Sequence, residues 1–67
     1  MIFTGDFETL VQLGYHTDLY CSYFFKTIVR YGSIFINVGT REITIEGIDK
    51  DDPLVKKELE KIKEYCE

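Results

Sequence analysis

Apolar and polar residues alternate in two neighbouring segments, residues 33–37 and 42–46, as is typical of strands with one buried face. The residues between them include Gly39, which can take the positive φ that a tight hairpin turn requires. The pattern therefore predicts a β-hairpin. Five apolar side chains would share one of its faces: Ile34, Ile36, Val38, Ile43 and Ile45.

Beyond the hairpin, the apolar residues recur at helical spacing. Asp52 followed by Pro53 is a strong start signal, because the carboxylate can accept free backbone N–H groups and proline fits the first helical position. The pattern predicts an amphipathic helix over residues 54–65 that lays one side on an apolar surface. Its apolar stripe is formed by Val55, Leu59, Ile62 and Cys66, with Leu54 and Tyr65 at the margin.

Residues 19–31 predict one long strand, because the segment is rich in aromatic and β-branched residues. Aromatic residues occupy both alternating sets of positions, so the pattern leaves two registers open. In the first register, Phe24 and its even-numbered neighbours point away from the helix. In the second, Tyr23 and Phe25 point away from it instead.

Residues 6–13 fit two periods. Phe7, Leu10 and Val11 fit a short helix that Gly14 would end, whereas alternation from Phe7 to Leu13 fits a strand. We favour the strand, because the segment is β-branched at two positions and a two-turn helix is marginal. Residues 14–18 then form a hairpin loop.

These elements predict an α+β fold, a four-stranded antiparallel meander sheet with one C-terminal amphipathic helix packed on one face. The 67 residues form a single small domain over positions 1–67. A chain of this length cannot form a two-domain enzyme, a barrel or a doubly wound nucleotide-binding fold.

The uncovered face of the sheet is the predicted binding surface, since an exposed apolar patch usually marks an interface. In the first register its residues are Tyr20, Phe24, Lys26, Ile28, Arg30 and Phe35. We expect a homodimer through this face, because a thin core gains stability from assembly. A different protein partner is the alternative.

Charge narrows the classes of partner. Eight basic against twelve acidic residues give a formal net charge of −4 and a pI near 4.9. This balance disfavours nucleic acid and anionic membrane surfaces. No apolar run is longer than three residues, as at residues 23–25, which is far too short to span a bilayer, and no signal peptide is visible. We therefore expect a cytoplasmic protein with no membrane association.

Side chains that could carry chemistry are few. His16, Asp18 and Cys21 are too few and too loosely spaced for a zinc site. Asp49, Asp51 and Glu60 match an EF-hand count at three positions, but Pro53 and Leu54 occupy the turn that needs glycine. We expect no metal and no cofactor.

A nucleophilic enzyme is also not expected. His16 is the only histidine base, and Cys21, its nearest thiol, is predicted to be packed within a strand. Cys21 and Cys66 are expected to be reduced thiols, with a disulfide between them as the alternative.

The expected function is a small acidic, non-enzymatic protein–protein interaction module. It would act as a regulator or inhibitor of the phage or mobile-element type by occupying a partner surface. The alternative is a single-stranded nucleic-acid-binding dimer with an aromatic and basic strand face. The predicted order of four strands and a helix resembles a family of single-stranded-DNA-binding coactivators that work as dimers. That resemblance implies a basic strand face, and the pI of 4.9 counts against one.

Overall fold

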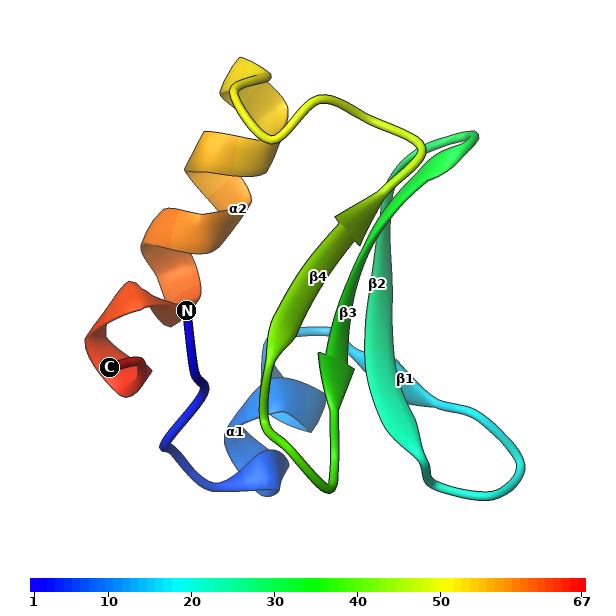
Figure 1. Cartoon of the computed structure of the whole chain (residues 1–67), viewed down its shortest axis with the longest axis vertical. Helices are drawn as coiled ribbons and strands as arrows, with labels where there is room; N and C mark the ends of the chain where they lie inside the picture. Colours follow the sequence, from blue (N-terminus) through cyan, green and yellow to red (C-terminus); the bar gives the residue numbers. More distant parts are fainter.

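The computed structural model describes all residues from 1 to 67, and its elements follow one another along the chain with short connections (Figure 1). They are α1 (Phe7–Gln12), β1 (His16–Thr17), β2 (Tyr23–Val29), β3 (Gly32–Asn37), β4 (Ile43–Glu46), α2 (Pro53–Ile62) and a 3₁₀ turn, η1 (Lys63–Tyr65).

The strands form one antiparallel sheet in the order β1-β2-β3-β4. Phe25 of β2 lies opposite Phe35 of β3, and Ile34 of β3 lies opposite Ile45 of β4. The predicted α+β class, the four-stranded antiparallel meander and the C-terminal helix are confirmed.

Both helices lie on the same side of the sheet, to its left in Figure 1, so its other face carries no element (Figure 1). The core lies between the helices and the sheet. Ile34 and Ile36 of β3 and Ile62 of α2 are fully buried in one cluster, as the alternating pattern predicted for the hairpin. The cluster consists of Phe3, Leu10, Tyr15, Phe24, Ile34, Ile36 and Ile62.

Helix α2 begins as its sequence predicts. The Asp52 carboxylate accepts a hydrogen bond of 2.9 Å from the Leu54 N–H, and Pro53 is the first helical residue. Val55 and Ile62 are completely buried, which confirms the predicted apolar stripe. The regular helix ends three residues earlier than predicted, and η1 continues it to Tyr65.

The predicted strand over residues 6–13 is wrong, because the segment forms helix α1. The three-residue spacing of Phe7, Leu10 and Leu13 places all three side chains against the core. A strand would have turned Val11 to the same side, yet Val11 is 58% exposed. The first strand is instead β1, within the segment expected to be a loop.

The long strand predicted over residues 19–31 is shorter at both ends, because β2 begins at Tyr23 and ends at Val29. Asp18 explains the late start. Its carboxylate accepts hydrogen bonds of 2.7 Å from the Ser22 N–H and hydroxyl and of 3.3 Å from the Tyr23 N–H. These bonds close a loop in which Cys21 has a φ of 53° and is exposed, not packed in a strand as predicted.

Positive φ angles occur elsewhere than expected. The hairpin turn places Arg41, at φ 65°, in the left-handed region, and Gly39 does not adopt it. The Arg41 guanidinium donates to the carbonyl oxygens of Phe3, at 3.2 Å, and Gly5, at 2.8 Å. Glycine is required at position 47, where φ is 77° and an added Cβ would overlap the Tyr31 carbonyl oxygen.

No element was predicted for the N-terminal residues, yet they form backbone pairs with two other parts of the chain. Ile2 pairs with Glu42 at the start of β4, and Phe3 pairs with Cys66 after η1. Phe3 is fully buried as a result. This segment covers the beginning of the outer edge of β4.

Candidate interaction surface

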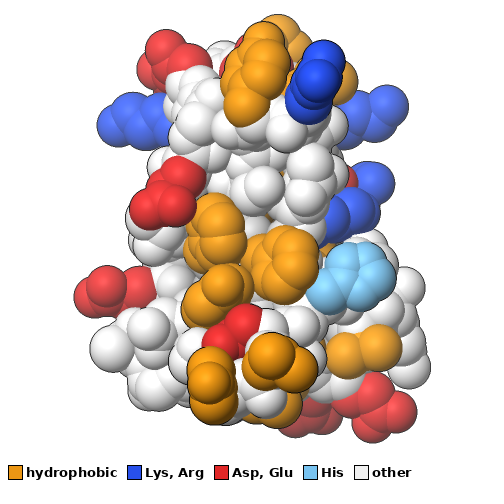
Figure 2. All heavy atoms as spheres, turned by 90° about the vertical axis from the view of Figure 1, so that its right-hand side faces the viewer, with side chains coloured by type: hydrophobic (Ala, Val, Ile, Leu, Met, Phe, Trp, Pro, Cys, Tyr) orange, Lys and Arg blue, Asp and Glu red, His pale blue; other side chains and the backbone are white.

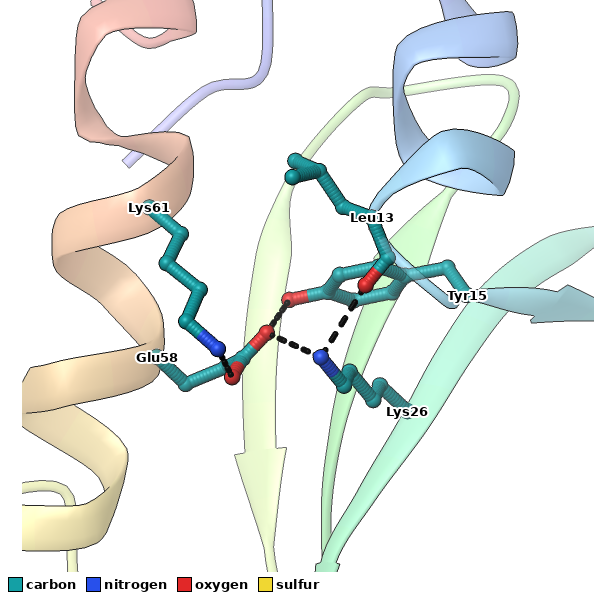
Figure 3. A network of polar contacts seen from close by, with 5 residues as sticks. All are labelled: Leu13, Tyr15, Lys26, Glu58 and Lys61. Atoms are coloured by element: carbon teal, nitrogen blue, oxygen red, sulfur yellow. Dashed lines mark hydrogen bonds and ion pairs between the residues drawn. The ribbon is translucent and has the colours of Figure 1, made fainter.

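An ion pair between β2 and α2 determines which face of the sheet meets the helices (Figure 3). Lys26 Nζ lies 2.8 Å from Glu58 Oε1, and Lys61 Nζ lies 3.2 Å from Glu58 Oε2. The Glu58 side chain is only 8% exposed. A buried carboxylate is costly without cationic partners, so Lys26 must point toward α2.

Two further contacts complete this polar network (Figure 3). Lys26 Nζ donates to the Leu13 carbonyl oxygen at 3.0 Å, and the Tyr15 hydroxyl donates to Glu58 Oε1 at 3.5 Å. Burial, with the Glu58 charge, raises the pKa of Tyr15 above its usual value. Burial alone would raise the pKa of Glu58, but the hydrogen bonds from Lys26 and Lys61 outweigh it and lower that pKa. The single carboxylate of Glu58 is therefore paired with one lysine from the sheet and one lysine from its own helix.

The orientation of Lys26 corrects the expected surface. Alternation along β2 turns Phe24, Lys26 and Ile28 toward the helices, and Phe24 is only 7% exposed. These three residues do not lie on the open face, so the first register is wrong. The second register, with Tyr23 and Phe25 outward, is the one observed.

The other residues of the predicted binding surface do not lie together on one face. Tyr20 is 88% exposed in the loop between β1 and β2. Arg30 is exposed in the turn between β2 and β3. Phe35 alone occupies the open face of the sheet as predicted, opposite Phe25.

Three aromatic rings contact one another on the open face, and we call them the ring cluster: Tyr23, Phe25 and Phe35. The ring centroids lie 5.9 Å apart for Tyr23 and Phe25, 5.4 Å for Tyr23 and Phe35, and 6.2 Å for Phe25 and Phe35. Each ring is half-buried by its neighbours and no element covers any of them. Figure 2 shows these hydrophobic side chains in the middle of the face.

Polar side chains border the ring cluster. The His16 ring lies 6.0 Å from the Phe25 ring and is exposed on β1, as Figure 2 shows at one side of the cluster. On the other side the face is hollowed. A shallow hollow of about 390 Å³ is lined by Tyr23, Phe35, Asn37, Thr44 and Glu46.

A larger hollow of about 590 Å³ lies between α2 and the chain ends. Met1, Leu59 and Cys66 form its apolar part, and its charged lining contains both lysine and glutamate side chains. Since the charges are of mixed sign, this hollow selects no particular ligand chemistry.

The remaining reactive side chains do not converge. Cys21 and Cys66 are both free thiols. Burial raises the pKa of the Cys66 thiol. No group of three His, Cys, Asp or Glu side chains lies close enough together to hold a metal ion.

Comparison with known proteins adds no relative. No protein-family model, no curated protein and no solved structure matches this chain. Neither helix has the length and apolar character that crossing a bilayer requires. The open face must therefore be interpreted from its own residues.

Proposed function

We propose that this chain is a small, non-enzymatic protein–protein interaction module that acts as a regulator or inhibitor by docking the open face of its sheet on a partner. The ring cluster carries this proposal. Three half-buried aromatic rings at the centre of an uncovered sheet face are typical of the anchors that dominate binding energy in protein interfaces.

The placement of the basic residues favours a protein partner over single-stranded nucleic acid. Stacking on aromatic rings needs nearby cations for the phosphates. Lys26 is bound to Glu58 on the opposite face, and Arg41 donates to backbone carbonyls. Glu46 lies beside the rings instead, and its charge would repel a phosphate backbone.

The expected homodimer would use the same face. Only 10 of 67 residues are buried in the single chain, so a second copy covering the rings would add stability. The test must therefore distinguish self-association from binding to another protein.

The experiment compares Phe25→Asp and Phe35→Asp with a matched control, Thr27→Asp. Thr27 is an exposed residue of β2, two positions after Phe25, so the control adds the same charge to the same strand outside the ring cluster. Molar mass is measured by light scattering under reducing conditions. A photo-crosslinking benzoylphenylalanine is placed at position 35, and at exposed Tyr31 as a reference, in the cells that produce the protein.

We expect either a dimeric mass or a crosslinked adduct through position 35, and we expect Phe25→Asp to abolish it while Thr27→Asp preserves it. A monomer with no adduct through position 35 would overturn the proposal. So would a complex that survives both phenylalanine substitutions. Steeply salt-sensitive oligonucleotide binding would establish the nucleic-acid alternative instead.

A further inference from the structure

The open face combines aromatic rings with an acid that has no cation. Glu46 and the rings of Tyr23 and Phe35 line the same hollow, together with the polar side chains of Asn37 and Thr44. Glu46 makes no ion pair, since the pairs in the molecule join Glu58 and Glu60 to lysines. No lysine or arginine lines this hollow.

The covered side of the molecule contains two cations placed against aromatic rings. Lys26 Nζ lies 5.6 Å from the centre of the Tyr15 ring while it pairs with Glu58. The Arg41 guanidinium carbon lies 4.3 Å from the centre of the Phe7 ring. At Lys26, an aromatic ring and a carboxylate together hold a cation that the chain itself supplies. The hollow offers aromatic rings and a carboxylate as well, but no cation of the chain lines it.

We infer that the hollow receives an arginine side chain from a partner protein, with the guanidinium against Tyr23 and Phe35 and paired with the Glu46 carboxylate. This inference rests on the proposed function and names the chemistry of the partner. A planar guanidinium can stack on an aromatic ring and donate to a carboxylate at the same time. Apolar residues beside that arginine would contact Phe25.

Charge complementarity selects this occupant over a second copy of the chain. The chain carries a net charge of −4, and a copy placed face to face would bring a second Glu46 to the same surface. A basic partner removes that repulsion and is also steered toward an acidic protein.

The test uses two peptides that differ only in charge, acetyl-Leu-Arg-Leu-amide and its citrulline counterpart. Each is titrated into ¹⁵N-labelled full-length protein and followed by chemical-shift changes. We expect saturable shifts at Tyr23, Phe35 and Glu46, with the arginine peptide binding about fivefold more tightly than the citrulline peptide.

Two glutamine variants isolate the carboxylate. Glu46→Gln should abolish the preference for arginine over citrulline, because it removes the only charge in the hollow. Glu42→Gln is the matched control, since it makes the same charge change at an exposed residue next to β4 that does not line the hollow. Phe35→Leu, which keeps an apolar side chain without the ring, should weaken the arginine peptide about threefold.

Three results would overturn the inference. Equal binding of the two peptides would mean that the hollow takes apolar side chains, and the proposed function would stand. A dimeric mass that depends on Phe35 would identify a second copy as the occupant, again with the proposed function intact. If neither peptide shifts these residues, the inference fails, and the mass and crosslinking experiments decide the proposed function separately.

Discussion

The two faces of the sheet carry similar side chains but differ in how their charges are paired. On the covered face, the Glu58 carboxylate is satisfied by Lys26, Lys61 and the Tyr15 hydroxyl. On the open face, Glu46 lies beside aromatic rings with no cation within ion-pairing distance. The covered face pairs its charges within one chain, whereas the open face presents half-buried rings and an unpaired, exposed acid to solvent.

This difference separates stability from binding along a single strand. Residues of β2 alternate between the faces, so substitutions at adjacent residues should affect different properties, stability on the covered face and binding on the open face. Phe24 belongs to the buried core, and Phe25 belongs to the ring cluster.

The largest expected effect comes from placing a charge at these two neighbours. Phe24→Asp should unfold the chain, because loss of a core phenylalanine costs about 3–5 kcal/mol and a buried carboxylate adds to that. A domain of 67 residues has a total stability of only about 3–10 kcal/mol. Phe25→Asp should cost about 1–2 kcal/mol and leave a folded protein. Urea unfolding followed by circular dichroism measures both, and equal losses would contradict the assignment of the faces.

The second comparison substitutes the acid on each face. Glu58→Gln should lower the free energy of unfolding by about 2–3 kcal/mol, because the ammonium of Lys26 loses its buried counter-charge. Glu46→Gln should change it by less than about 0.5 kcal/mol, since Glu46 is exposed and unpaired. Urea midpoints of the two variants measure the difference.

A double variant serves as the control for Glu58. Replacing Lys26 and Glu58 together by methionine should restore part of the lost stability, because no unpaired charge then remains between the sheet and the helix, and Lys61 is exposed to solvent. If the stability lost in the double variant equals the sum of the losses in the single variants Lys26→Met and Glu58→Met, the two side chains are not coupled and the network does not act as a pair.

The elements of this fold could be predicted from the sequence where the hydrophobic period was unambiguous. The hairpin of β3 and β4 and the helix α2 satisfy one period each, and both elements were correctly predicted, although α2 ends earlier than expected. Residues 6–13 satisfy both periods, and the choice depended on packing against the sheet, where the Phe7 ring stacks on the ring of Phe24, a residue distant in sequence. Such a contact leaves no trace in a local pattern.

The orientation of β2 could not be obtained from hydrophobicity, because aromatic residues occupy both of its faces. One signal was nevertheless present. Glu58 falls on the buried side of α2 between Val55 and Ile62, so it requires a cation from the sheet. Lys26 is the only lysine or arginine within the four strands. The requirement of Glu58 for a cation would therefore have placed Lys26, and with it Phe24, on the covered face.

Lowering the pH should have a smaller effect on the free energy of unfolding. The pKa of Glu58 is lowered in the folded protein, so its ionised form stabilises the fold above the pKa of the unfolded chain. That contribution is lost as the pH falls through the folded pKa, which lies below the ordinary pKa of glutamate. The stability difference between the wild type and Glu58→Gln should therefore be constant from pH 7 to pH 5 and narrow below pH 4. Urea midpoints at these pH values test this, and Glu46→Gln should show no comparable narrowing.

The smallest expected effect concerns the rate at which the two thiols react, since one is exposed and the other is half-buried. Cys21 is exposed in the loop between β1 and β2. Cys66 is half-buried, pairs with Phe3, and its Sγ donates to the Ile62 carbonyl at 3.2 Å. Burial raises the pKa of Cys66, so a smaller fraction of this thiol is ionised at pH 8 than of an ordinary cysteine. Iodoacetamide should modify Cys21 at least about threefold faster, as followed by mass spectrometry of Cys21→Ser and Cys66→Ser variants. In urea the two rates should converge, because unfolding removes the burial; rates that already agree in the folded protein would mean that the chain ends do not cover Cys66.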